Sequence, residues 1–187
     1  IFQFYNKNWG LRITDLHQGI VWGVETEYTK LAPELVNRFD YDGIYGTVLN
    51  RFISQAANDL PLTVYGTGGQ SRAFIHISDT ARCVELAINS GEFECKKPRI
   101  FNQVSEVRSV IELANILEKS YGAKIDFKEN PRKELAENEL EVSNAGLVSL
   151  GLEPIKLDES LVEDVKFIAE LTKERFNPEN VMKSPKW

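Results

Sequence analysis

An arginine that directly follows a glycine-rich turn is the residue of this sequence best suited to hold an anion. The stretch Leu62 to Asp79 reads LTVYGTGGQSRAFIHISD, with two strand-like runs around the turn Gly66-Thr67-Gly68-Gly69. Strand alternation puts Arg72 on the face opposite Ala73 and Ile75. Because a guanidinium group can fork onto phosphate oxygens, Arg72 is a candidate ligand of a diphosphate. On physical grounds alone, a solvated or ion-paired arginine is the commoner arrangement.

The same glycines invite a different interpretation, a phosphate-binding loop. The dinucleotide fingerprint requires a strand, then G-x-G-x-x-G, then a helix whose N-terminus faces the pyrophosphate. Here a second strand-like run, Arg72 to Ile77, follows the glycines instead. We therefore reject the phosphate loop and predict a β-hairpin, in which glycine supplies the positive φ angles of the turn.

A second pair of candidates begins a predicted helix from about Tyr45 to Asn58. Its apolar stripe consists of Leu49, Phe52, Ile53 and Ala56. Thr47 and Arg51 are four residues apart and share a helix face, near the first turn that favours an anion. Gly43 and Gly46 would let a ligand approach the backbone. The alternative, a capping threonine and a surface arginine, stays equally open.

Two further segments place polar side chains where ligands bind. Asn130-Pro131 is a good helix start, since proline at the first position loses no useful N–H, and Arg132 follows it. A cation there opposes the helix dipole, so a bound anion or the carboxylate of Glu134 should lie close. An intrahelical ion pair is the commoner outcome. His17 and Gln18 end the first strand-like run, where α/β sheets bind ligands.

The order of predicted elements indicates an α/β fold. Strands are expected at 11–16, 62–65, 72–77, 99–104 and 124–127. Helices are expected at 45–58 and 106–120, and two more should begin at 131 and at 158. A further helix should begin with a cap at Ser78 or Asp79 and end at about residue 89. Residues 19–23 and the acidic excursion 24–42 are expected as loops, and 177–187 as an extended tail. Trp22 and Cys83 are expected in the core and His76 in a structural hydrogen bond. Strands so few and short suggest part of a larger α/β fold.

Composition narrows the function classes. The 187 residues suffice for one domain, 1–187, with its own core. No apolar run approaches the ~20 residues of a membrane helix. A net charge of −6 without a Lys/Arg cluster argues against nucleic acid as a partner. Two cysteines without metal-ligand spacing, Cys83 and Cys95, favour a reducing compartment such as the cytoplasm or a plastid stroma.

Together these segments resemble the extended short-chain dehydrogenase/reductases, the NAD-dependent epimerase/dehydratase family. The shared pattern is Leu62 to Gly66, then Arg72, then Phe74 to Ile77, then Asp79. Within that family, several stretches are similar to the UDP-sulfoquinovose synthases in particular. These are Trp9 to Leu16 with Gln18-Gly19, Asn37 to Asp42, Gly46 to Phe52, Phe101 to Gln103, Asn130 to Arg132, and Gly151 to Pro154. The excursion at 24–42 also fits that group, and the matches cover nearly the whole chain.

The resemblance implies the C-terminal part of a Rossmann fold with a small α/β substrate-binding lobe. It implies an enzyme that holds NAD, binds UDP-glucose and adds sulfite to form UDP-sulfoquinovose for sulfolipid or sulfonated glycans. Arg72 would contact the diphosphate of UDP, and Gln18 and Gly19 would lie where cofactor and sugar meet. The remaining substrate-binding residues would be Thr47, Arg51, Gln70, Ser71, Arg132 and Glu134.

The sequence departs from that family in one large respect. It contains neither the glycine-rich NAD fingerprint nor a Tyr-x-x-x-Lys pair, so no catalytic or metal-binding residue is assigned and an N-terminal NAD-binding half is the expected partner. The chain alone is expected to be inactive, and a homodimer is compatible with this picture. Two alternatives remain: half of another nucleotide-sugar epimerase or dehydratase, or a non-catalytic nucleotide-sugar-binding module.

Overall fold

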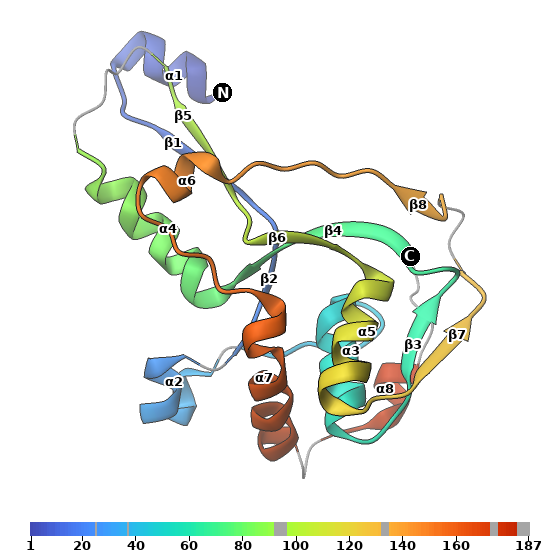
Figure 1. Ribbon diagram of the computed structural model, residues 1–187. Helices are drawn as coiled ribbons and strands as arrows, with labels where there is room; N and C mark the ends of the chain where they lie inside the picture. Colours follow the sequence, from blue (N-terminus) through green and yellow to red (C-terminus); the bar gives the residue numbers. More distant parts are fainter. Residues whose placement is uncertain (25, 37, 92–96, 132–134, 173–175, 183–187) are drawn as a thin grey trace.

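Three small sheets, mostly of parallel strands, form the framework of the protein (Figure 1). The computed structural model describes residues 1–24, 26–36, 38–91, 97–131, 135–172 and 176–182. The first sheet pairs β1 (Thr14–Gln18) with β5 (Arg99–Gln103), and another pairs β3 (Leu62–Tyr65) with β7 (Ile125–Lys128). The third has the order β2 (Ile20–Trp22), β4 (Gly69–His76), β6 (Glu106–Ser109), with β8 (Glu137–Asn138) also on β4. The predicted α/β class is confirmed.

Helices surround these sheets in two groups. Near β1 and β5 lie α1 (Phe2–Trp9), α4 (Ile77–Asn89) and α6 (Ala145–Ser149) (Figure 1). Near β3 and β7 lie α3 (Val48–Ala57), α5 (Val110–Tyr121) and α8 (Pro178–Met182), and α7 (Leu157–Thr172) packs against α3 and α5. The excursion that leaves β2 contains the short α2 (Glu27–Leu31) and the 3-10 turn η1 (Pro33–Leu35). Because α3, α5 and α7 contact one another, they bury their apolar stripes together.

Strand β4 separates two hydrophobic cores. Phe74 packs in the larger core with Trp22, while its neighbour Ile75 packs in the smaller one with Cys83. All four side chains are at most 2% exposed. The core positions predicted for Trp22 and Cys83 are therefore confirmed, and both faces of β4 are buried here because successive side chains of a strand point to opposite sides.

The turn between β3 and β4 is confirmed, but the predicted hairpin is wrong. β3 pairs with β7, whereas β4 pairs with β2, β6 and β8. Gly66 and Gly68 have φ angles of 61° and 71°, as expected of turn glycines. The carbonyl of Gly68 accepts from Ile111 N at 2.9 Å, and a Cβ on Gly68 would lie 2.8 Å from Val64 Cγ1. The glycines thus let the chain press against the start of α5, and the two strands diverge to other partners.

Several other segments differ from the predictions, among them the excursion 24–42, which contains α2 and η1 rather than loop alone. Residues 20–22 form a strand rather than a loop, and 178–182 form a helix rather than an extended tail. Residues 106–109 form β6 along β4, so the helix expected from 106 starts only at Val110. Ser109 caps that helix in a capping box with Glu112. Pro131 lies in a bend and β8 follows at 137, so the described residues after 134 do not continue a helix from Pro131.

Helix α4 is capped by His76 rather than by Ser78 or Asp79. His76 Nδ1 accepts from the backbone N–H of Ser78 at 3.2 Å, and the ring packs edge-on against Trp22 with centroids 4.7 Å apart. The predicted structural hydrogen bond of His76 is confirmed. The Asp79 carboxylate points elsewhere, and its Oδ2 accepts from Ile155 N at 2.7 Å and from the Ser105 hydroxyl at 3.2 Å.

Burial of His76 should make the fold sensitive to mild acid. His76 is 5% exposed, and burial lowers its pKa from 6.5 to about 4. Between these pH values the His76 imidazole is protonated in the unfolded chain but not in the folded chain. The free energy of unfolding therefore falls as the pH falls. Urea titrations should show His76 removing about 3 kcal/mol between pH 7.5 and 4, since each pKa unit corresponds to ~1.4 kcal/mol.

The matched variant is His76→Asn, because asparagine can cap a helix and does not titrate in this range. As the pH is lowered from 7.5 to 4, the free energy of unfolding of His76→Asn should decrease less than that of the wild-type chain. Parallel curves for the two proteins would contradict the assignment of this sensitivity to His76.

Candidate functional site

The first half of β4 carries three of the predicted site residues, Gln70, Ser71 and Arg72. It is hydrogen-bonded to the segment that ends in β8. Gln70, 6% exposed, donates from Nε2 to the Leu135 carbonyl at 3.3 Å. The N–H of Ser71 donates to Asn138 Oδ1 at 2.8 Å. Arg72 Nη1 donates to the Ser71 carbonyl at 2.9 Å and approaches the same Asn138 oxygen at 3.5 Å. Arg72 is thus a half-buried, hydrogen-bonded arginine at the edge of β4.

The structure places Gln18 and Gly19 beside this strand. Gln18 ends β1 and is exposed, and Gly19 leads directly into β2. The N–H of Gly19 donates to the Gln103 carbonyl at 3.0 Å. A Cβ on Gly19 would lie 2.9 Å from the carbonyl oxygen of Ala73, the residue after Arg72. The close backbone contact therefore brings the predicted cofactor-contacting residues to the strand that carries the predicted diphosphate ligand.

Helix α3 supplies the second arginine, at the other side of the glycine-rich turn. Arg51 lies over the ring of Tyr65, 5.7 Å from its centroid. Tyr65 ends β3 opposite Lys128, and Gly66 N donates to the Lys128 carbonyl at 2.8 Å. Arg51 therefore lies near the carboxyl ends of two parallel strands, a common place for ligands in α/β proteins.

Thr47 caps helix α3, which is one of its two predicted roles. Its hydroxyl oxygen accepts from the backbone N–H of Asn50 at 3.2 Å, which caps α3. The loop before it is ordered by Asp42, whose carboxylate accepts from the N–H groups of Ile44 and Tyr45, both at 2.7 Å. Those bonds lower the pKa of Asp42. The capping bond leaves α3 starting at Val48, three residues later than predicted.

Arg132 and Glu134 lie outside the described residues. The described residues before and after them lie near the glycine-rich turn and β4, respectively. Asn130 Cβ is 3.5 Å from the position that a Cβ on Gly66 would take, and the chain from Leu135 to Asn138 runs along β4. Of the described residues, Asn130 thus lies beside the glycine-rich turn, and Leu135 to Asn138 lie beside the strand of Arg72.

Sequence reasoning missed two residues of this region, Asn138 and Tyr65. Asn138 bonds both the N–H and the carbonyl of Ser71, at 2.8 and 3.4 Å, and so fixes β4 where Arg72 follows. No local pattern marks Asn138, which lies 67 residues from Ser71. Tyr65 stood in the motif around the turn, but its contact with Arg51 depends on the packing of α3 against β3.

The chemistry of the described site is that of anion and polar-group binding. Within the described ranges, no cluster of three or more His, Cys, Asp or Glu residues is arranged to hold a metal ion. His76, whose pKa burial lowers, and Asp79, whose pKa burial raises, are both buried and held in structural hydrogen bonds at α4. Across the same ranges, no helix is both long and apolar enough to cross a membrane. Two arginines, amide groups and strand ends thus define what this region offers a ligand.

Comparison with known proteins identifies the relatives of this chain. Residues 28–102 match the NAD dependent epimerase/dehydratase family. The chain is 45% identical over 98% of its length to chloroplastic UDP-sulfoquinovose synthase of Spinacia oleracea, and 37% identical over 88% to UDP-sulfoquinovose synthase of Sulfolobus acidocaldarius. It spans only 39% and 42% of these two relatives.

A solved structure agrees on the fold. UDP-glucuronic acid 4-epimerase of Bacillus cereus, in complex with UDP-glucuronic acid and NAD, aligns with a TM-score of 0.65 at 23% identity, over 90% of this chain and 48% of that one. At that identity the likeness concerns the fold, a Rossmann-type epimerase fold of which this chain corresponds to about half. By its sequence match to the sulfoquinovose synthases, the chain belongs to the NAD-dependent epimerase/dehydratase family.

Proposed function

We propose that this chain is the sugar-nucleotide-binding half of a UDP-sulfoquinovose synthase. It would bind UDP-glucose for NAD-dependent conversion, with sulfite, to UDP-sulfoquinovose. The observation that carries the proposal is the 45% identity to the spinach synthase over nearly the entire chain. The placement of Gln18 beside the strand of Arg72, and of Arg51 at the carboxyl ends of β3 and β7, supports it, because a nucleotide sugar needs cationic and polar contacts within an extended site.

Arg72 is the proposed ligand of the diphosphate. Its planar, permanently charged group matches phosphate oxygens, and Asn138 and the β4 backbone hold it before a ligand arrives. Gln70 and Ser71 would line the same pocket, and Arg51 would contribute a second cation. Thr47 would line the same pocket at the start of α3, which its hydroxyl oxygen caps. Roles for Arg132 and Glu134 rest on the resemblance alone.

NAD would supply the reversible oxidation of the sugar when it is bound. The chain fits one edge of a dinucleotide site: Gln18 is exposed at the carboxyl end of β1, and Gly19 keeps the backbone close to β4. The fingerprint and the Tyr-x-x-x-Lys pair are absent from the 187 residues. The proposed task of this half is therefore to bind and orient the sugar nucleotide, while the other half holds most of the cofactor.

Two observations favour a second candidate function: the chain could be half of another nucleotide-sugar enzyme. UDP-glucuronic acid decarboxylase 4 of Arabidopsis thaliana is 30% identical over 75% of the chain. A histidine at position 76 is also more typical of the wider family than of the synthases. Calorimetric titration separates the two candidates: a synthase half should prefer UDP-glucose, and a decarboxylase half should prefer UDP-glucuronic acid.

Replacing Arg72 tests the proposed site most directly. In the enzyme that contains both halves, Arg72→Ala should weaken UDP-glucose binding by roughly 10- to 150-fold. Charge-assisted bonds to a phosphate contribute on the order of 1.5–3 kcal/mol, and each ~1.4 kcal/mol is tenfold in affinity. The NAD content should not change, because the cofactor belongs mainly to the other half. Calorimetric titration measures the affinity, and bound NAD is read from absorbance.

Arg82→Ala provides the matched control, since Arg82 is a half-exposed arginine on α4 that pairs with Glu85 at 2.6 Å. It should bind UDP-glucose like the wild-type enzyme. Arg51→Ala should act in the same direction as Arg72→Ala but more weakly if its contact is exposed to solvent. An Arg72→Ala protein that is folded and keeps wild-type affinity would remove the diphosphate role.

The chain by itself should lack activity. Because the Tyr-x-x-x-Lys pair and the fingerprint are missing, the purified 187-residue chain should neither retain NAD nor convert UDP-glucose and sulfite. Mass spectrometry of the reaction mixture is the measurement. Any sulfonated sugar nucleotide above a no-protein blank would show that these residues suffice for the reaction.

A further inference from the structure

Two arginines lie opposite each other on strands β4 and β6. The strands are antiparallel, and Arg72 is the direct partner of Arg108 in their register. Residues paired in this way share one face of the sheet with Cβ atoms roughly 5 Å apart, and like charges at such positions are destabilising. The side chain of Arg108 is 33% exposed and Arg72 is half-buried, so solvent screens the repulsion only in part. Other groups must therefore separate or neutralise the two charges.

Carboxylates neutralise Arg108 on its own side of the pair. Its Nε donates to Glu106 Oε2 at 2.6 Å, and its Nη1 lies 4.0 Å from Glu112 Oε1. The side chain of Glu106 is only 9% exposed. Its other oxygen, Oε1, accepts from the N–H of Leu157 at 2.7 Å, at the start of α7. Both oxygens of Glu106 are thus engaged, one by Arg108 and one by the backbone of α7.

The guanidinium of Arg72 is held toward the opposite edge of β4. The Phe74 carbonyl accepts from Ser105 N at 2.7 Å on the side of β6. Because successive residues of a strand turn their backbone groups to alternate edges, Ser71 faces the other edge, where its N–H donates to Asn138. Arg72 Nη1 donates to the Ser71 carbonyl at 2.9 Å on that same edge. These contacts draw the guanidinium of Arg72 away from that of Arg108.

Glu106 is the carboxylate best placed to disturb this arrangement. It lies opposite Phe74 and two residues from Arg108 along β6, so it is the diagonal neighbour of Arg72 on the same face. Diagonal neighbours are roughly 7–8 Å apart, a separation that long side chains can bridge. A buried carboxylate that has lost its cation is costly, so without Arg108 the Glu106 carboxylate would favour pairing with Arg72. Such a pair would compete with phosphate for the same guanidinium.

We propose that Arg108 is a positioning residue for the diphosphate-binding arginine: by occupying Glu106, and by its own charge, it keeps the Arg72 guanidinium at the edge of β4 that carries Asn138. The inference rests on the proposed function, because it takes Arg72 as the ligand of a diphosphate. It adds a residue that acts through Arg72 rather than by contact with the nucleotide sugar. The short bond from Arg108 Nε to Glu106 argues against a direct contact of Arg108 with phosphate.

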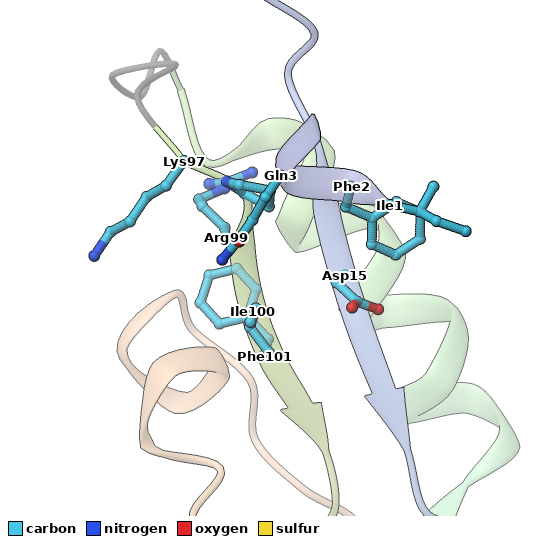
Figure 2. Close-up of a pocket in the computed structure, with 9 residues that line it drawn as sticks. Ile1, Phe2, Gln3, Asp15, Lys97, Arg99, Ile100 and Phe101 are labelled. Atoms are coloured by element: carbon cyan, nitrogen blue, oxygen red, sulfur yellow. The ribbon is translucent and has the colours of Figure 1, made fainter. Parts of the chain in front are cut away.

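Arg99 is the matched control, a half-buried arginine in a different setting. It begins β5 beside a pocket of about 810 Å³ that also adjoins the first turn of α1 (Figure 2). Its Nη2 donates to Thr14 Oγ1 at 2.9 Å and to the Ala87 carbonyl at 2.7 Å. Its partner in the register of β1 and β5 is also Thr14, which carries no charge. Loss of Arg99 should therefore affect stability without affecting Arg72.

A double-mutant cycle in the enzyme that contains both halves tests the positioning role. Arg108→Ala should weaken UDP-glucose binding by roughly 5- to 50-fold, a part of the loss expected for Arg72→Ala, because Arg72 would be diverted to Glu106. In the Arg72→Ala background the same change should alter the affinity less than about twofold, since residues that act through one another are not additive. Arg108→Ala/Glu106→Gln should recover most of the affinity, because the competing carboxylate is then neutral. Calorimetric titration measures each affinity.

Three further variants separate positioning from a general effect on the fold. Arg108→Gln keeps a hydrogen-bond donor for Glu106 but removes the charge, so it should lose affinity like Arg108→Ala even if the alanine variant does not fold. Arg108→Lys keeps the cation and should bind within about threefold of the wild-type enzyme. Arg99→Gln should lower the unfolding temperature and leave the affinity for UDP-glucose unchanged.

The possible results distinguish failure of this inference from failure of the proposed function. Wild-type affinity in folded Arg108→Gln, beside a loss in Arg72→Ala, would overturn this inference alone. Equal losses from Arg108→Ala with and without Arg72 would make Arg108 an independent ligand and would also overturn it. The expected cycle measured with UDP-glucuronic acid, in an enzyme that does not bind UDP-glucose, would refute the synthase half and leave the positioning role standing.

Discussion

The absence of a side chain at Gly19 is the constraint on which the rest of the arrangement depends. Thr14 to Trp22 is one extended stretch that serves two sheets, pairing first with β5 and then with β4. At the crossing, the backbone of Gly19 lies against the Ala73 carbonyl, and a Cβ would come within 2.9 Å of it. Any larger residue would force the sheets apart and move Gln18 away from the strand that carries Arg72. The relative positions of Gln18 and Arg72 in the candidate site thus depend on the close contact at Gly19.

Sequence patterns within a few residues were sufficient to predict those elements whose conformation depends on neighbouring residues. The bounds of β3 were predicted at Leu62 and Tyr65, and the apolar stripe of α3 was identified because periodicity is visible within a few residues. The turn at Gly66 and Gly68 was recognised from glycine alone, and both residues have positive φ. These features depend on backbone preferences and on amphipathic spacing.

Contacts between distant segments were not predictable in the same way. The hairpin expectation failed because β3 pairs with a strand 63 residues further on in register, Leu62 with Ile125. The cap of α4 was misplaced because a histidine side chain, held by Trp22, replaced the expected Ser78 or Asp79. Arg72 was singled out by its turn and by resemblance, whereas the support from Asn138 comes from tertiary pairing. Sequence therefore singled out candidate side chains, but it did not indicate the contacts that hold them.

The backbone just before helix α7 donates a hydrogen bond to a buried carboxylate, that of Asp79. Asp79 is 5% exposed and burial raises its pKa, which the N–H of Ile155 and the hydroxyl of Ser105 partly offset. Lys156 Nζ adds a bond to the Ser105 carbonyl at 2.6 Å. The family match ends at residue 102, before Ser105, Ile155 and Lys156. A polypeptide trimmed to that match would keep the carboxylate and discard what solvates it, so the boundary of recognisable ancestry is not the boundary of an autonomous folding unit.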